Sequence, residues 1–175
     1  MPPLTVMESL QPLKDHFNAH RGTPRFVAVI SPTCQHCVDG ANAIQASLIT
    51  GFPSAEMSMS VVWIDGVKTD TVAKARQRAK RMDDPRFQHF HDPNRLAGKA
   101  IAAMLGGAGK IAWDMYLFFD RKSRWTTRPP LPVSYLHQLP QEYVPWADPT
   151  HYYSGDRLRS ELHHTMQRMT GGQTR

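Results

Sequence analysis

The chain carries two cysteines, and both fall in one short stretch, PTCQHC, as Cys34 and Cys37. The apolar positions from Cys37 onward recur at steps of four and three, which predicts a helix over about residues 34–49 with one buried stripe (Cys37, Ala41, Ile44, Leu48). Cys34 then lies in the first turn, where unpaired backbone amides and the helix dipole stabilise an anion. The spacing therefore predicts a reactive thiolate at Cys34 and a buried partner at Cys37, a pair suited to thiol–disulfide exchange.

Two polar residues accompany the cysteines. His36 lies between them, and as an imidazolium it would stabilise the Cys34 thiolate further and make the pair more oxidising. The alternative for His36 is an exposed side chain on the first turn, with no role. Asp39, just after the pair, is either a group that assists proton transfer or an ordinary surface carboxylate.

The same two thiols could instead bind a soft metal ion. Cys34 and Cys37 supply two soft ligands, and the stretch HFH places His89 and His91 on one side of a predicted strand. These four residues form the alternative ligand set of a copper-type carrier. The competing interpretation is that both histidines are surface groups at the edge of a strand.

A strongly basic segment, KARQRAKR, occupies residues 74–81 and holds much of the net charge of +6. On a helix, Lys74, Arg78 and Arg81 share one flank, while an apolar stripe faces the core (Val72, Ala75, Ala79, Met82). The flank is either a patch for acidic partners or nucleic acid, or a solvated helix face. Nucleic acid is not expected, because no aromatic side chains interleave with the charges.

The elements that position these residues alternate along the chain. Periodicity predicts strands at about 25–31, 59–66, 86–90 and 114–120, and a further strand within VSYLHQL. Helices are predicted at about 3–19, 34–49 and 154–169, over the basic segment, and after Asp92 and Pro93, which suit a helix start. Such alternation is typical of an α/β fold with a largely parallel sheet.

A strand followed by Cys-x-x-Cys at the start of a helix resembles the thioredoxin-like superfamily. The stretch FQHFHDPNRLAGKAIAAMLGGAGKIAWDMYLFFDRKS is similar to the redoxin (peroxiredoxin-like and thiol-reductase-like) branch, and the resemblance spans about residues 22–125. It implies a three-layer sandwich with a central, mixed but mostly parallel sheet between helices. We expect one domain over residues 1–175, with a core at about 22–140, an N-terminal helix within 1–21 and a C-terminal extension, 141–175, that ends in a helix.

The chain departs from this family at three places. Thr33 stands where thioredoxins carry Trp before the first cysteine, and Ala28 stands where they carry a buried acid. The family's cis-proline position falls on Asp114, after Trp113, or on Pro132 in another register. The resemblance thus implies that Thr33, Trp113 and Asp114 form the loop that faces Cys34.

The resemblance implies a thiol–disulfide oxidoreductase that reduces a protein disulfide or a small oxidised molecule, draws electrons from a thiol donor and needs no organic cofactor. A cytoplasmic location is expected, since neither a signal pattern nor an apolar run of membrane-spanning length is present. Besides metal carriage, a third possibility is a non-catalytic docking module that uses the aromatic-rich segment at 135–153.

Overall fold

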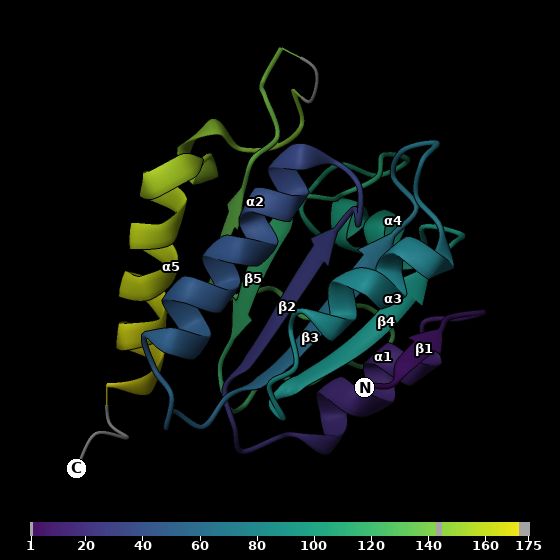
Figure 1. Ribbon diagram of the computed structural model, residues 1–175. Helices are drawn as coiled ribbons and strands as arrows, with labels where there is room; N and C mark the ends of the chain where they lie inside the picture. Colours follow the sequence, from purple (N-terminus) through teal and green to yellow (C-terminus); the bar gives the residue numbers. More distant parts are fainter. Residues whose placement is uncertain (1, 143–144, 172–175) are drawn as a thin grey trace.

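A computed structural model describes residues 2–142 and 145–171 and is built around one six-stranded sheet with the order β1-β4-β3-β2-β5-β6 (Figure 1). The strands are β1 (Leu4–Val6), β2 (Arg25–Ile30), β3 (Ser58–Ile64), β4 (Phe87–Asp92), β5 (Met115–Phe119) and β6 (Ser134–His137). The helices are α1 (Gln11–Ala19), α2 (Gln35–Ile44), α3 (Val72–Lys80), α4 (Leu96–Met104) and α5 (Gly155–Thr170), with a π-helical segment η1 (Gln45–Thr50) and a 3₁₀ turn η2 (Pro149–His151).

The sheet is mixed and mostly parallel, which confirms the predicted fold class. β1, β4, β3 and β2 run parallel to one another, β5 is antiparallel to β2, and β6 is antiparallel to β5. β2 and β3 are buried along their whole length, as their nearly continuous apolar sequences require of strands covered on both faces.

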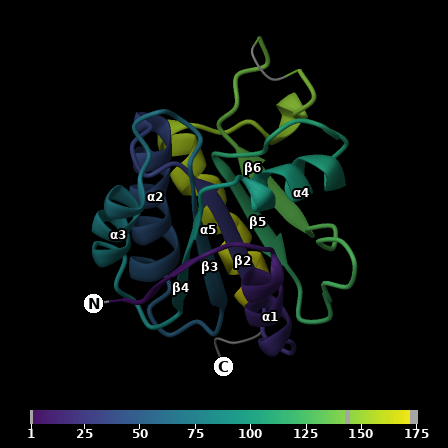
Figure 2. The same cartoon turned by 90° about the vertical axis from the view of Figure 1, so that its right-hand side faces the viewer.

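Helices cover both faces of the sheet. α2, α3 and α5 contribute to one hydrophobic cluster, whereas α1 and α4 contribute to a second cluster on the opposite face. Figure 2 shows this separation, with α2 and α3 on one side of the strands and α1 and α4 on the other. The arrangement is the predicted three-layer sandwich, and the carboxyl end of β2 leads directly into α2.

The N-terminal prediction of one helix over residues 3–19 is wrong. Residues 4–6 form β1, which hydrogen-bonds to the outer edge of β4, and α1 begins only at Gln11, with Pro12 in its first turn. The open edge of β4 offers backbone partners to a short segment that contains β-branched Thr5 and Val6. Met7 is buried, as its apolar character suggested, but it lies in the connection between the two elements.

Two further helices differ in detail from the sequence prediction. Asp92 does accept hydrogen bonds from the amides of Leu96 and Ala97, yet α4 starts three residues later than expected, after Arg95 in the left-handed region (φ 57°). In α3 the predicted apolar stripe is buried except for Val72, which is 37% exposed because it stands at the first turn.

The remaining predicted elements agree with the structure. The strand predicted within VSYLHQL is β6, and the terminal helix α5 buries Leu158, Leu162 and Met166 as its periodicity indicated. No helix among the described residues combines the length and apolar character required to cross a membrane.

Candidate functional site

The two cysteines lie where β2 passes into α2. Cys34 is the N-cap residue of α2 and is partly exposed, whereas Cys37, one turn further, is fully buried beneath it. Both are free thiols. The sequence-based expectation of one accessible and one buried sulfur at a helix start therefore agrees with the geometry.

The two thiols differ in acidity because their surroundings differ. The pKa of Cys34 is lowered from 9.0 to about 6, first by a hydrogen bond from the Cys37 side chain and then by the backbone amides of Cys37 and His36. Burial raises the pKa of Cys37 well above its ordinary value, and the hydrogen bond to Cys34 and the charge of Asp114 add to this rise. At neutral pH, Cys34 is thus mostly thiolate, and Cys37 keeps its proton.

The turn that carries Cys34 is held by Ser31 and Asp70. The Cys34 amide donates to the Ser31 hydroxyl at 3.0 Å, and that hydroxyl donates to Asp70 at 2.8 Å. Asp70 also accepts from the Thr33 hydroxyl at 2.6 Å and from the amides of Gly66 and Val67. This buried carboxylate joins the β2–α2 loop to the β3–α3 loop. Nothing in the sequence near Asp70 signalled that role, because its partners lie up to 39 positions away.

A second buried carboxyl lies against the cysteines. Asp114 is 3% exposed and precedes β5, which pairs with β2. Its Oδ1 accepts from the Tyr116 hydroxyl at 2.6 Å and from Gln138 Nε2 at 2.8 Å. Burial raises its pKa, and its charge in turn raises the pKa of both Cys34 and Cys37, which places it within electrostatic reach of both sulfurs.

Asp114 also occupies the position where the resemblance expected a cis-proline. Its φ of 55° is in the left-handed region, which Asp tolerates better than most residues. Among residues 2–142 and 145–171, every peptide bond is trans, and this includes the bonds that precede Asp114 and Pro132, the two candidate cis positions. A buried acid fills this place instead.

Small residues make room for the hydroxyl that Asp114 binds. Tyr116 pairs with Ala28 across the β2–β5 ladder, and its ring lies beneath α2 at Gly40. A Cβ at Gly40 would lie 1.7 Å from the Tyr116 hydroxyl, so only glycine fits there. Ala28 and Tyr116 are cross-strand partners on β2 and β5, so a small side chain lies beside the Tyr116 ring.

Gln138, the residue that follows β6, completes this hydrogen-bond network. Its Nε2 contacts Asp114 Oδ1, the Tyr116 hydroxyl and the His36 carbonyl, the last at 2.8 Å. The side chain thereby connects the buried acid to the Cys34–Cys37 turn. Sequence reasoning placed residue 138 on a final strand without a role, since its contacts depend on strand pairing.

The other predicted site residues lie around this centre. The His36 side chain is exposed, and its charge lowers the pKa of Asp114, while its amide contributes to the lowered pKa of Cys34. Trp113 is half-buried against the backbone of Gly66. Asp39 is exposed and accepts from the side chain of Gln35.

The histidines of the copper-type alternative do not join the cysteines. His89 and His91 are both buried, so the interpretation as surface groups at a strand edge is wrong. His89 hydrogen-bonds to Trp63 Nε1 and to a backbone carbonyl, and His91 hydrogen-bonds to Asp65 at 2.8 Å. In the described part of the chain, no three His, Cys, Asp or Glu side chains are grouped closely enough to share a metal ion.

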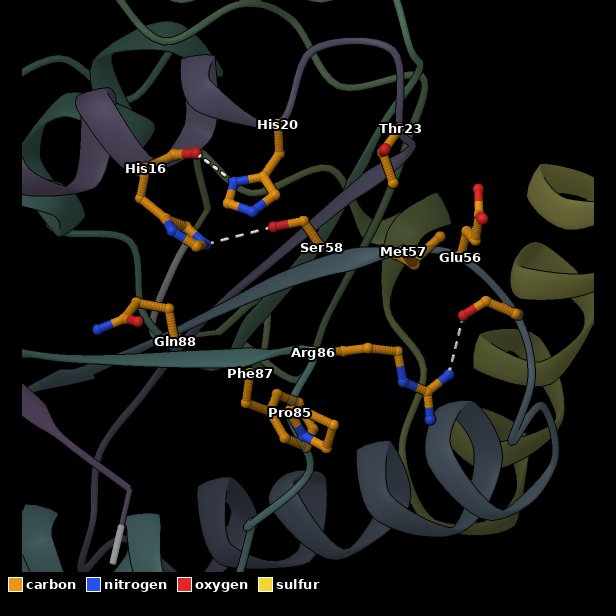
Figure 3. Close-up of a pocket in the computed structure, with 11 residues that line it drawn as sticks. His16, His20, Thr23, Glu56, Met57, Ser58, Pro85, Arg86, Phe87 and Gln88 are labelled. Carbon is orange, nitrogen blue, oxygen red and sulfur yellow. Dashed lines mark hydrogen bonds between the residues drawn. The ribbon is translucent and has the colours of Figure 1, made fainter.

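A cavity of about 650 Å³ lies at the other end of the sheet, at the start of β3 and β4 (Figure 3). His16 Nε2 lies 3.2 Å from the Ser58 hydroxyl on its wall. Arg86 also lines it, but its guanidinium is bonded to Asp84 and to the carbonyls of Phe52 and Ala55. This cavity is therefore separate from the thiol centre, and its arginine is already engaged within the protein.

Comparisons with known proteins bear on the fold. No protein-family model matches the chain, and no curated protein matches its sequence. Among solved structures, a candidate protein disulfide isomerase from Bacteroides thetaiotaomicron is 12% identical, with a TM-score of 0.50 over 87% of this chain and 77% of that one.

Two other solved structures match at lower TM-scores. A secreted Mycobacterium tuberculosis disulfide oxidoreductase homologous to E. coli DsbE is 13% identical, with a TM-score of 0.47 over 86% of this chain and 84% of that one. A candidate thioredoxin from Neisseria meningitidis is 16% identical, with a TM-score of 0.38 over 65% and 68% of the two chains.

The sheet order, the three layers and the first of these matches define the fold class. The chain has a thioredoxin-like α/β fold, with a Cys-x-x-Cys pair at the amino end of the helix that follows its central strand β2. The finer assignment to the redoxin branch stays a prediction.

Proposed function

We propose that the protein is a thiol–disulfide oxidoreductase that cycles between a Cys34–Cys37 dithiol and a Cys34–Cys37 disulfide. The observation that carries this proposal is the opposite acidity of the two thiols. The accessible sulfur has a pKa of about 6, and the buried sulfur has a pKa well above 9.0. A thiolate attacks disulfides and a thiol does not, so this difference assigns the first attack to Cys34.

In the first step, the Cys34 thiolate attacks one sulfur of a substrate disulfide. The substrate S–S bond breaks, a mixed disulfide forms at Cys34, and the other substrate sulfur leaves as a thiolate that takes a proton from water. Once the negative charge of Cys34 is consumed, one of the causes that raise the pKa of Cys37 disappears.

In the second step, Cys37 gives its proton to the carboxylate of Asp114 and attacks Cys34 Sγ. The mixed disulfide breaks, the second substrate thiolate leaves, and the Cys34–Cys37 disulfide forms, so that two electrons have passed to the substrate. Asp114 suits proton acceptance because burial raises its pKa and because it interacts electrostatically with Cys37. A thiol donor then returns the pair to the dithiol.

Net reduction of the substrate is the proposed direction, in the cytosol as the proposed location. A cytosolic thiol pool keeps such a pair mainly reduced, so the dithiol is the form that meets substrate. Both a protein disulfide and a small oxidised molecule fit this reaction as substrates.

The test combines mass spectrometry with a redox titration. Wild-type protein treated with hydroxyethyl disulfide should form the internal disulfide, Cys37→Ser should accumulate a mixed disulfide at position 34, and Cys34→Ser should stay unmodified. A glutathione series should give a reversible two-electron couple that needs both thiols, with a lower potential in His36→Ala.

Two outcomes would contradict the proposal. Absence of any Cys34-dependent reaction with a neutral disulfide would favour the docking-module interpretation. Stoichiometric binding of a soft metal ion by wild type, with no measurable redox couple, would favour metal carriage.

A further inference from the structure

A cationic pocket lies directly beside the thiol centre. It has a volume of about 350 Å³ and is lined by two residues of the β2–α2 loop and four of α3 and its C-cap (Pro32, Thr33, Lys74, Gln77, Arg78, Arg81). Thr33 is the residue that precedes Cys34, so the pocket begins one peptide unit, about 3.8 Å between Cα atoms, from the reactive residue.

The pocket is tied to the loop that carries Cys34. Arg78 Nε donates to the Pro32 carbonyl at 2.9 Å, which fixes α3 against the turn two residues before the cysteine. Beyond this contact, Arg78 and Arg81 also line the crevice between α2 and α3, beside Val38 and Asn42. The cations therefore follow the wall from the Cys34 loop along α2.

The cations that line the pocket lack ion-pair partners in the part of the chain that the structure describes. Among the described residues, Lys74, Arg78 and Arg81 form no ion pair. Arg78 has a pKa below its ordinary value because it is partly buried and because Arg81 repels its charge. Asp70 accepts hydrogen bonds from Ser31, from Thr33 on the pocket wall and from two amides, and it forms no ion pair with these cations. Like charges on one helix face destabilise that helix, so this grouping is suited to an external anion.

We infer that this pocket binds the carboxylate group of a small anionic disulfide and so selects the substrate of the neighbouring Cys34. This inference rests on the proposed function and adds a substrate class to it. A thiolate repels an anionic disulfide, and the cations of a pocket that begins at Thr33 can attract such a molecule toward the neighbouring Cys34 and raise its local concentration. The pocket is large enough for the arm of such a molecule, with its carboxylate a few bonds from the sulfur.

The causes that lower the pKa of Cys34 separate this role from activation of the thiol. They are hydrogen bonds from the Cys37 side chain and from the amides of Cys37 and His36. The cations of α3 are thus placed to bind the substrate, and their removal should leave Cys34 as acidic as before.

The experiment compares three small disulfides of similar size and different charge. They are dithiodipropionate, a dianion; hydroxyethyl disulfide, which is neutral; and cystamine, a dication. The rate constant of reduced protein with each is measured for wild type, for Lys74→Gln/Arg81→Gln and for the matched control Arg76→Gln/Lys80→Gln. The control residues are exposed on the same helix outside the pocket, and both variants lose the same net charge.

The expected result is a loss of charge preference in the pocket variant alone. The ratio of the dianion rate to the neutral rate should fall by about threefold to tenfold in Lys74→Gln/Arg81→Gln, as expected for two partly solvated charge contacts. The ratio should stay near that of wild type in the control, and added salt should reduce it in both wild type and control. The rate with hydroxyethyl disulfide should be unchanged in all three proteins.

Three results would overturn the inference. One is an unchanged ratio in the pocket variant, and another is an equal loss in the control, which would assign the preference to net charge. The third is a wild-type protein that reacts with the dication cystamine as fast as with the dianion, which would show that the pocket does not select its substrate by charge. In each case a Cys34-dependent reaction with the neutral disulfide would still support the proposed function, and its absence would contradict that function separately.

Discussion

Cys34 and Cys37 lie within a single helical turn, yet the pKa of the first thiol is lowered and the pKa of the second is raised. Cys34 is the N-cap residue of α2, and the Cys37 side chain and nearby amides lower its pKa, whereas burial raises the pKa of Cys37. Burial of Cys37, its hydrogen bond to Cys34 and the backbone amides produce this difference in pKa, and the charge of Asp114 adds to the rise at Cys37. The Cys37 side chain is the largest cause of the low pKa of Cys34.

We predict that the pKa of Cys34 depends on a donor at position 37. Below its pKa of about 6 the thiol is protonated, so alkylation of Cys34 by iodoacetamide should rise with pH through that value and level off above it. In Cys37→Ala the midpoint should move upward toward an ordinary thiol, because the donor is lost. In the matched variant Cys37→Ser it should stay low, because the hydroxyl donates. Equal midpoints in the two variants would rule out this explanation.

A second prediction concerns the buried acid. Asp114→Asn should slow the release of the second substrate thiol by about tenfold or more, since a positioned proton acceptor is lost. The first attack by Cys34 should not slow. Both hydrogen bonds to Asp114 end on Oδ1, and Asn also tolerates a positive φ, so the fold should be retained. Stopped-flow measurement of the two steps across a pH series distinguishes them, and equal slowing of both would refute the assignment.

The residues that act through sequence proximity could be predicted, and those that act through tertiary contacts could not. The spacing of Cys34 and Cys37 indicated their placement, because one helical turn separates them. Asp114 was expected to face the cysteines, and Tyr116 is only two positions away, but its role was hidden because its burial and its contact with Gln138 depend on the pairing of β5 with β6. Asp70 gave no local pattern at all.

At the level of elements, α2 is positioned by its contact with β5. Gly40 lets the helix approach the Tyr116 hydroxyl, which in turn bonds to Asp114. After Ile44 the helix widens into the π-helical segment η1, which packs against α5 through the hydrogen bond from the Ser47 hydroxyl to the Arg159 carbonyl. The helix that carries the thiols is therefore held at both ends, by the network beneath its first turns and by α5 at its last.

Gly40→Ala should disturb both the stability of the fold and the buried network. The new Cβ would lie 1.7 Å from the Tyr116 hydroxyl, and we expect a loss of about 1–3 kcal/mol in the free energy of unfolding. The exposed neighbour on the same helix, Asn42→Ala, serves as control and should change stability by less than about 0.5 kcal/mol. Urea unfolding measures both, and a Gly40→Ala protein as stable as wild type would contradict the packing described.

The elements also show where periodicity fails as a guide. The helical spacing of residues 7, 10, 13 and 17 was real, yet the segment before Gln11 pairs with β4 because an open strand edge competes with helix formation. The bounds of the central strands were predicted nearly to the residue. A continuous apolar run of this length is typical of a strand that is buried on both faces.

In the molecule as a whole, the two ends of β2 have different roles, one in the thiol site and one in holding the fold together. Its carboxyl end leads to Cys34, and its amino end carries Arg25, which is 1% exposed. The Arg25 guanidinium donates to the carbonyls of Phe17, Asp120 and Ser123, so it joins α1 to the segment after β5. The reactive thiol and the arginine that anchors α1 therefore lie at opposite ends of the central strand β2 (Figure 1).

Arg25→Met should weaken the fold without slowing the thiol chemistry. Three carbonyls, one of them in a fully buried hydrogen bond, would lose their donor, and we expect a loss of about 3 kcal/mol in the free energy of unfolding. The exposed Arg21→Met is the matched control and should change it by less than about 0.5 kcal/mol. Denaturant unfolding and the Cys34 alkylation rate are measured together. A slower alkylation in folded Arg25→Met would show that the two ends are coupled.

The position of Asp114 beside both sulfurs has one more consequence. Because its charge raises the pKa of Cys34, the ionised Cys34 must equally disfavour ionisation of the carboxyl, and formation of the disulfide removes that effect. The carboxyl group is therefore a natural infrared reporter of the oxidation state. A difference spectrum between the oxidised and reduced protein should contain bands of this enclosed carboxyl group, visible without any label.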